Sequence, residues 1–110
     1  MITVDTTDPV PLARWWAEQV GREITQENDG FFVIVASGDG SPLLGFQKVD
    51  EPTPGKNRVH LDMVTSDLGA EVDRLVADGA TKIADHEMPG FSWVTLTDPD
   101  GNQFCVSAAH

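Results

Sequence analysis

The sequence predicts an α+β fold of two βαβββ modules that form a curved mixed sheet around a cavity. Two observations lead to this prediction. The order strand, helix, strands occurs twice along the 110 residues, and the two copies superpose at a spacing of about 59 residues, too long and too few for a solenoid. Two modules sharing one sheet would bury their apolar faces together. We therefore expect one domain over residues 1–110, with a first module over about 1–50, a linker over about 51–57 and a second module over about 58–110.

The first half begins with a short strand, because apolar and polar residues alternate over residues 2–5. A helix follows, with Asp8 as its N-cap and Pro9 at its first position. Gly21 suits the end of that helix, since glycine readily adopts the left-handed conformation found there. The remaining elements expected in this half are a strand, a turn and a returning strand, over residues 31–35, 37–42 and 43–49.

The second half repeats the same order of elements. Alternation predicts a strand over residues 59–64, and Ser66 or Asp67 can cap a helix that ends at Gly79. The Asp-Pro-Asp-Gly segment at 98–101 predicts a tight turn, because proline fixes φ and glycine tolerates positive φ. We expect that turn to join two adjacent antiparallel strands. We also expect a strand over residues 81–84, a loop over 86–90, a strand over 93–96 and a last strand over 104–106.

Charge and composition restrict the classes of partner. The net charge is −11, from 18 acidic and 7 basic residues, so we expect neither nucleic acid nor an anionic membrane surface to bind. A cationic small molecule would instead be attracted. No apolar stretch is long enough for a membrane helix, and the first residues do not resemble a signal peptide. The single cysteine, Cys105, excludes an intrachain disulfide framework. A cytoplasmic location is expected.

Strand alternation divides the residues between two faces of the sheet. Apolar positions such as Leu61 and Phe104 are expected beneath the helices. Their neighbours then point to the other face, where they would line a concave, partly polar cavity. The residues expected there are Thr3, Asp5, His60, Asp62, Gln103, Cys105 and Ser107.

Two segments resemble the glyoxalase/bleomycin-resistance/dioxygenase superfamily, also called the vicinal oxygen chelate superfamily. Residues 56–62 read KNRVHLD, similar to the opening of the second module in small glyoxalase-like domains. Residues 91–106 read FSWVTLTDPDGNQFCV, similar to their closing hairpin. The resemblance implies paired βαβββ modules around a central cavity. In many members a divalent metal is held there by His, Gln or Glu on the first strand and Glu on the last strand of each module, whereas other members sequester a ligand without metal.

This sequence keeps one of the four metal ligands that the resemblance implies. His60 stands at a ligand position, but Cys105 replaces the glutamate of the second module, and the first module offers Met1 and the apolar stretch 44–46. Zinc needs three or four protein donors, so the sequence predicts no metal cofactor. Asp5 or Asp62 could complete a site with His60 and Cys105, and this alternative stays open. Cys105 could also act as a nucleophile with His60 as base, but a free cysteine is more often a small buried apolar residue.

The sequence therefore predicts a glyoxalase-like small-molecule-binding protein that needs no metal, with bleomycin-resistance-like sequestration as one form of this function. The ligand is expected to be aromatic or cationic, and we predict no catalytic residue. One alternative is a metal-dependent lyase, isomerase or dioxygenase acting on a vicinal-oxygen substrate. Another is a dimerising accessory module without a small ligand. A homodimer is expected, since members of the superfamily commonly pair. The residues predicted to bind the ligand are His60, Asp62, Gln103, Cys105, Phe46 and Trp93.

Overall fold

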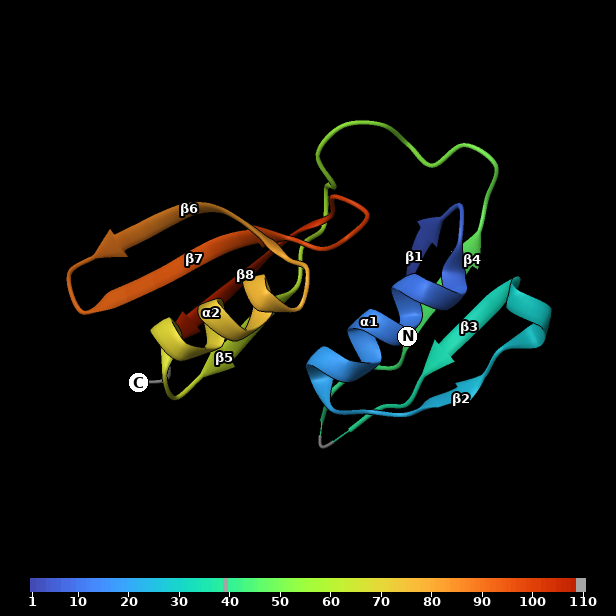
Figure 1. Ribbon diagram of the computed structural model, residues 1–110, viewed down its shortest axis with the longest axis horizontal. Helices are drawn as coiled ribbons and strands as arrows, with labels where there is room; N and C mark the ends of the chain where they lie inside the picture. The colour runs from blue at the N-terminus through green and yellow to red at the C-terminus, as the bar shows by residue number, and fades with distance from the viewer. Residues whose placement is uncertain (39, 109–110) are drawn as a thin grey trace. The chain divides into compact units, whose positions relative to one another are not determined.

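The chain forms two compact units, each with one four-stranded mixed sheet and one α-helix (Figure 1). The units span Met1–Pro54 and Gly55–His110 in a computed structural model that describes residues 1–38 and 40–108. Asp39, inside the turn predicted over 37–42, and residues 109–110 lie outside the described residues. The prediction of an α+β fold with two βαβββ modules is confirmed, but each module has a four-stranded sheet of its own in place of the single shared sheet that was expected. Within the described residues, neither helix has the length and apolar character needed to cross a membrane.

In the first unit the sheet has the strand order β1-β4-β3-β2. Its first strand runs parallel to β4, and the other neighbours are antiparallel. The helix begins with Pro9 and ends before Gly21, whose φ of 66° gives the left-handed cap that the sequence predicts. The elements of this unit are β1 (Ile2–Thr6), α1 (Pro9–Val20), β2 (Ile24–Gln26), the 3₁₀ turn η1 (Asn28–Gly30), β3 (Phe32–Val35) and β4 (Leu44–Lys48).

The second unit repeats this topology with the strand order β5-β8-β7-β6. Its first strand is again parallel to its last, and the remaining pairs are antiparallel. The helix is capped by Asp67, whose carboxylate accepts a hydrogen bond from the Ala70 N–H at 3.1 Å. The elements are β5 (Asp62–Thr65), α2 (Leu68–Ala77), β6 (Thr81–Met88), β7 (Phe91–Thr97) and β8 (Gln103–Ala108).

The two units share one strand register. Val4 lies opposite Phe46 in the first unit, and Met63 lies opposite Val106 in the second. These pairs are equivalent, as the superposition of the two halves predicts. The same register makes Gly45, next to Phe46, the counterpart of Cys105. Each position of one unit can therefore be compared with its counterpart in the other.

In each unit the helix covers one face of its sheet and the apolar core lies between them (Figure 1). Phe46 is 1% exposed and belongs to the core beneath α1, so its predicted role in ligand binding is not supported. In the second unit Leu75 of α2 is fully buried. Of the sheet residues expected beneath the helix, Phe104 is buried and Leu61 is half-buried. The other main core side chains are Leu12, Trp16, Val33, Val35, Leu96, Phe104 and Val106.

Two edge strands differ from the prediction. The three-residue strand β2 was not expected from the sequence. The strand expected over 81–84 extends to Met88 and so includes His86, which was placed in a loop. The chain reverses between Met88 and Phe91 through a tight turn in which Gly90 has a φ of 75°. Both strands lie at sheet edges, where polar side chains face water and the apolar alternation is lost.

The turn at 98–101 joins the adjacent antiparallel strands β7 and β8, as predicted. Asp98 is only 4% exposed, and its carboxylate accepts hydrogen bonds from the backbone N–H groups of Asp100 and Asn102 at 3.0 and 2.9 Å. The Asn102 side-chain amide donates to the same carboxylate at 3.2 and 3.0 Å. One buried carboxylate thus holds the turn closed.

Candidate functional site

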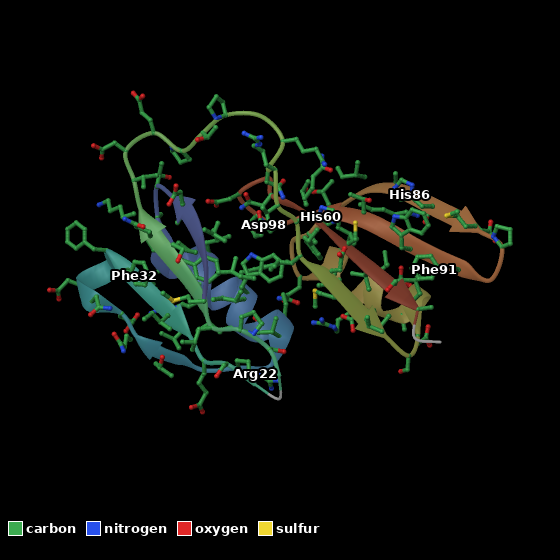
Figure 2. The ribbon with its side chains drawn as sticks, turned by 180° about the vertical axis from the view of Figure 1, so that it is seen from behind. Arg22, Phe32, His60, His86, Phe91 and Asp98 are labelled. Carbon is green, nitrogen blue, oxygen red and sulfur yellow. The ribbon has the colours of Figure 1, made fainter. Side chains whose placement is uncertain are left out.

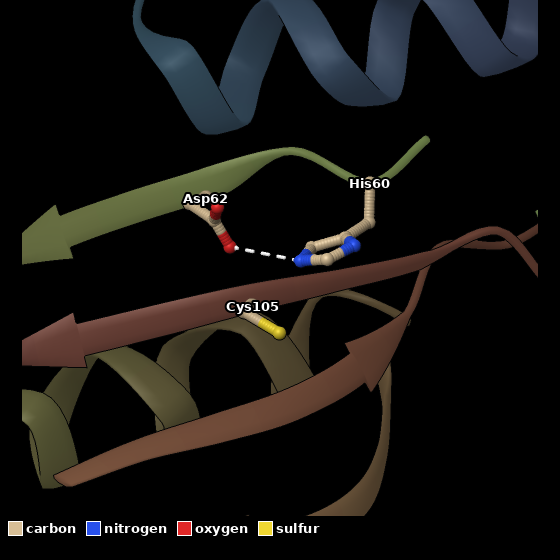
Figure 3. A group of neighbouring side chains, drawn as sticks. All are labelled: His60, Asp62 and Cys105. Carbon is tan, nitrogen blue, oxygen red and sulfur yellow. Dashed lines mark ion pairs between the residues drawn. The ribbon is translucent and has the colours of Figure 1, made fainter. Parts of the chain in front are cut away.

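Three chemically active side chains of the second unit converge on one face of its sheet (Figure 3). One donor atom from each of His60, Asp62 and Cys105 lies within 4.8 Å of the others. His60 Nε2 and Asp62 Oδ1 are 3.3 Å apart. The His60 and Asp62 side chains are 44% and 69% exposed, so ligands and ions can reach them. The structure thus brings together three of the six residues that the sequence predicts to bind a ligand.

The parallel pairing of β5 with β8 explains this convergence. Asp62 and Cys105 are direct partners in that pairing, so their side chains stand beside each other on one face. The Cys105 N–H also donates to the Leu61 carbonyl at 2.9 Å, which continues the pairing beyond the end of β5. His60 precedes the strand, although the sequence predicted a strand from residue 59. It still lies two residues before Asp62 and shares its side of the chain.

Asn57 holds the segment that carries His60, a role that the sequence interpretation missed. Its side-chain amide donates to the Gln103 carbonyl at 2.9 Å, and its side-chain oxygen accepts from the Gln103 N–H at 2.7 Å. The same amide donates to the Val59 carbonyl at 2.8 Å. These bonds tie the entry into β5 to the start of β8. The sequence did carry a signal for this role, namely an asparagine ahead of a predicted strand, because asparagine side chains readily form hydrogen bonds with backbone groups.

A row of polar side chains crosses the sheet from this cluster. Thr95 Oγ1 lies 3.5 Å from Cys105 Sγ and 3.1 Å from His86 Nε2. Thr95 is the direct partner of Cys105 between β7 and β8. The row links side chains from all four strands of the unit.

An aromatic cluster adjoins the polar row on the same face. The His86 ring stacks on Trp93 with centroids 4.9 Å apart and planes 12° apart. The Phe91 ring lies 5.3 Å from Trp93 in a tilted arrangement. Figure 2 shows His86 and Phe91 on the β6–β7 hairpin, with His60 further along the same unit. Trp93 is half-buried and Phe91 is 38% exposed, so part of this aromatic surface is open.

We call this surface, formed by His60, Asp62, Cys105, Thr95, His86, Trp93 and Phe91, the β5–β8 face. Gln103 belongs to it by register, since it lies two residues before Cys105 on β8. Its backbone groups are engaged by Asn57. Five of the six predicted binding residues therefore share one face of one sheet, and Phe46 is the exception.

The corresponding positions of the first unit carry no such chemistry. Met1, Thr3 and Gly45 are the counterparts of His60, Asp62 and Cys105. A Cβ added to Gly45 would lie 3.0 Å from Phe32 Cζ and 3.1 Å from Met1 Sδ. A side chain at this position would crowd the Phe32 ring and the Met1 thioether. The residues present therefore do not fit a metal that needs ligands from both modules.

The first unit has an open depression of about 370 Å³ elsewhere. Arg14 and residues 24–27 line it, and Arg14 Nη2 lies 3.8 Å from Glu27 Oε1 across it. Both side chains are more than half exposed, and exposed ion pairs contribute little to stability or specificity. None of the predicted site residues lies there.

Comparison with known proteins gives a consistent picture of the fold. The sequence model of a family described as glyoxalase-like domain matches residues 1–107. A glyoxalase/bleomycin resistance protein/dioxygenase family enzyme from Burkholderia phytofirmans PsJN is 19% identical, with a TM-score of 0.82 over 99% of this chain and 96% of that chain. A superfamily member from Sphaerobacter thermophilus DSM 20745 is 18% identical, with a TM-score of 0.72 over 99% and 96% of the two chains.

Lactoylglutathione lyase from Agrobacterium tumefaciens has a TM-score of 0.70 at 15% identity, over 99% of this chain and 92% of that chain. A search of curated proteins gave no match. At such low identities the structural likeness establishes the fold alone.

Proposed function

Because this chain belongs to the glyoxalase-like domain family, we propose that it binds a small aromatic or cationic organic molecule on the β5–β8 face. Binding is direct, through stacking, hydrogen bonds and charge. It does not use the family's metal. Sequestration of the kind found in bleomycin-resistance proteins is one form that this function would take.

The observation that carries the proposal is the continuity of aromatic and polar groups on one face. Trp93 and Phe91 offer an apolar, π-rich surface beside His86. Thr95 connects that surface to Cys105. Binding sites for small molecules usually combine apolar and aromatic contact with a few placed polar groups. The β5–β8 face has both within one sheet.

Charge favours a cationic or partly cationic ligand. The Asp62 carboxylate is exposed at one end of the face, and the chain carries a net charge of −11. Trp93 can attract a cation through its π-electrons, which contributes about 0.5–2 kcal/mol per contact. A planar aromatic cation would therefore contact both the stacked rings of His86 and Trp93 and the carboxylate of Asp62.

Metal independence rests on the chemistry of the first unit. Methionine and glycine occupy the positions at which the family resemblance expects metal ligands. A hard divalent ion prefers several oxygen donors, and these positions offer none. We therefore assign no resident metal cofactor and no catalytic step to the protein.

The test is a binding titration with berberine, a planar aromatic cation, and with metal-free bleomycin, both in the presence of EDTA. One molecule of berberine is expected to bind per chain. Trp93→Ala should weaken binding by about 2- to 30-fold, the equivalent of one cation–π contact. Isothermal titration calorimetry measures both the stoichiometry and the affinity.

Matched variants separate this face from general charge and surface effects. Asp62→Asn should weaken berberine binding, whereas Asp73→Asn removes the same charge from an exposed position of α2, outside the face, and should not. Phe31→Ala removes an aromatic ring that is 62% exposed outside the face and serves as the control for Trp93. The proposal is wrong if berberine and bleomycin both fail to bind, or if the variants of the face bind as tightly as their controls.

We also propose that the protein is a homodimer in the cytoplasm, where a reducing environment keeps Cys105 as a free thiol. Large apolar side chains that remain exposed on the second unit, Val64, Ile83 and Met88, support pairing. Sedimentation equilibrium should give twice the 11.9 kDa mass of the chain. A monomer mass up to the highest soluble concentration would contradict the dimer.

A further inference from the structure

We propose that the open depression of the first unit binds a free α-amino acid, with its carboxylate at Arg14 and its ammonium group at Glu27. The depression has a volume of about 370 Å³ and is lined by Arg14 and residues 24–27. It shares no residue with the β5–β8 face, so the site goes beyond the function proposed above. The two sites take different ligands on different units of the chain.

Two opposite charges meet in the lining of the depression. Arg14 Nη2 lies 3.8 Å from Glu27 Oε1, a distance longer than a hydrogen bond between these groups. An exposed ion pair of this kind contributes little to stability, so a ligand can separate or bridge the two groups at little cost. With side chains 69% and 55% exposed, Arg14 and Glu27 are both accessible to a ligand.

A ligand that carries both charges close together matches this arrangement. In an α-amino acid the ammonium nitrogen lies about 2.5 Å from the carboxylate carbon, as the standard bond lengths and angle require. A single amino acid can therefore reach Arg14 and Glu27 together. The planar guanidinium of Arg14 suits a carboxylate, with which it can form two parallel hydrogen bonds. The Glu27 carboxylate can accept hydrogen bonds from the ammonium group.

Charge favours a zwitterion over a simple anion or a simple cation. The net charge of −11 repels an anion that would bind Arg14 alone. A simple cation at Glu27 would meet the guanidinium of Arg14, which lies 3.8 Å from the carboxylate. A zwitterion places a charge of opposite sign against each of the two groups and carries no net charge into the field of the protein.

The size and lining of the depression restrict the side chain of the amino acid. Its volume lies near the lower end of the range of about 300–1,000 Å³ that is usual for small-molecule sites. Ile24 is half-buried and offers an apolar contact, whereas Thr25 and Gln26 have exposed polar side chains. A polar, uncharged side chain can form hydrogen bonds with Thr25 and Gln26, so glutamine is the amino acid chosen for the test.

The elements that carry the two charges are fixed before any ligand binds. The helix that carries Arg14, α1, packs against β2 and β3 (Figure 1). The Gly30 N–H donates to the Glu27 carbonyl at 2.8 Å. In the same turn Asn28 and Asp29 have φ angles of 45° and 54°, which residues other than glycine rarely adopt. Strain of this kind occurs often at ligand sites, and a site held in place binds at a lower entropic cost.

The experiment follows the backbone amide signals of the full-length, isotope-labelled protein by NMR while glutamine is added at neutral pH. The expected dissociation constant is on the order of 1 mM, since ion pairs in an open site are weak. Signals of β2, Glu27 and the part of α1 around Arg14 should shift along one binding curve, and those of the β5–β8 face should not. N-acetylglutamine lacks the ammonium group and glutaminamide lacks the carboxylate, so each should bind at least about threefold more weakly.

Matched variants identify the two charged groups. Arg14→Gln and Glu27→Gln should each weaken glutamine binding by about 3- to 10-fold, between the effect of an exposed ion pair and that of a charged hydrogen bond. The second unit supplies the controls, because Arg74 and Glu71 form an ion pair within α2. Arg74→Gln and Glu71→Gln make the same changes of charge there and should leave glutamine binding unchanged. Circular dichroism of each variant checks that the fold is retained.

Three results would overturn the amino-acid site. Binding of N-acetylglutamine or glutaminamide as tight as that of glutamine would show that only one charge is recognised. Equal binding by the Arg14 and Arg74 variants would show that glutamine binds elsewhere. Absence of any shift at about 10 mM glutamine, well above the expected dissociation constant, would show that the depression does not bind it. Berberine binding depends on Trp93 in the second unit, so failure of this site and failure of the proposed function are distinguishable.

Discussion

Replacing Phe46 with alanine is expected to lower the free energy of unfolding by about 3–5 kcal/mol, the usual cost of removing a buried phenylalanine ring. Phe46 is 1% exposed and lies in register with Val4 and Val33 beneath α1. Its removal leaves a cavity that the surrounding side chains cannot fill. Urea unfolding followed by circular dichroism measures the loss, and the melting temperature should fall by more than about 10 °C.

The same variant tests the ligand-binding role that the sequence suggested for Phe46. Phe31→Ala, which removes a ring of the same size that is 62% exposed, should change stability by no more than about 0.5 kcal/mol. A Phe46→Ala protein that is as stable as its parent but no longer binds berberine would return Phe46 to the binding surface and contradict its assignment to the core.

Replacing Asp98 with alanine is expected to cost about 2–4 kcal/mol, because hydrogen bonds to a buried carboxylate are among the strong ones. The carboxylate of Asp98 accepts from the Asp100 and Asn102 backbone and from the Asn102 side chain. Without it, the turn between β7 and β8 keeps the proline and glycine but loses the group that closes it. Thermal and urea unfolding measure the cost.

A second effect should accompany the loss of stability. The turn sets the register that places Thr95 beside Cys105, so Asp98→Ala should also weaken binding at the β5–β8 face. Asp73→Ala removes an equal charge from an exposed position of α2 and should be close to neutral. Equal stability of the Asp98 and Asp73 variants would show that the turn does not depend on the buried carboxylate.

The order of elements could be read from the sequence because local signals agreed. Pro9 and Gly21 mark the two ends of α1, and the segment at 98–101 marks a turn that the structure has in the same place. The edge strands β2 and β6 could not be predicted from such local signals. Ile24–Gln26 forms a strand only because β3 offers it a partner, and the length of β6 depends on pairing with β7 through polar residues such as His86.

The sequence predicted which side chains share the β5–β8 face, but not how closely they approach one another. Alternation placed Asp62 and Cys105 on one face, yet their closeness depends on a parallel register between residues far apart in the chain. No local pattern specifies such a register. Phe46 was assigned to the ligand-binding face for a related reason. Leu44, Gly45 and Phe46 are all buried, and this stretch has no alternation of polar and apolar residues that would show which side chain points toward α1.

The parallel pairing of the first and last strands also governs the order in which the chain can fold during synthesis. In each unit the partners, such as Ile2 with Leu44 and Asp62 with Cys105, are about 40 residues apart, so closing the sheet carries a loop-closure cost that a hairpin avoids. Neither unit can finish its sheet until its last strand has left the ribosome. The first can do so once Lys48 has emerged, before the second exists. A nascent chain cut short before Gln103 would therefore retain every strand of the first sheet and lack the central strand on which Cys105 is carried.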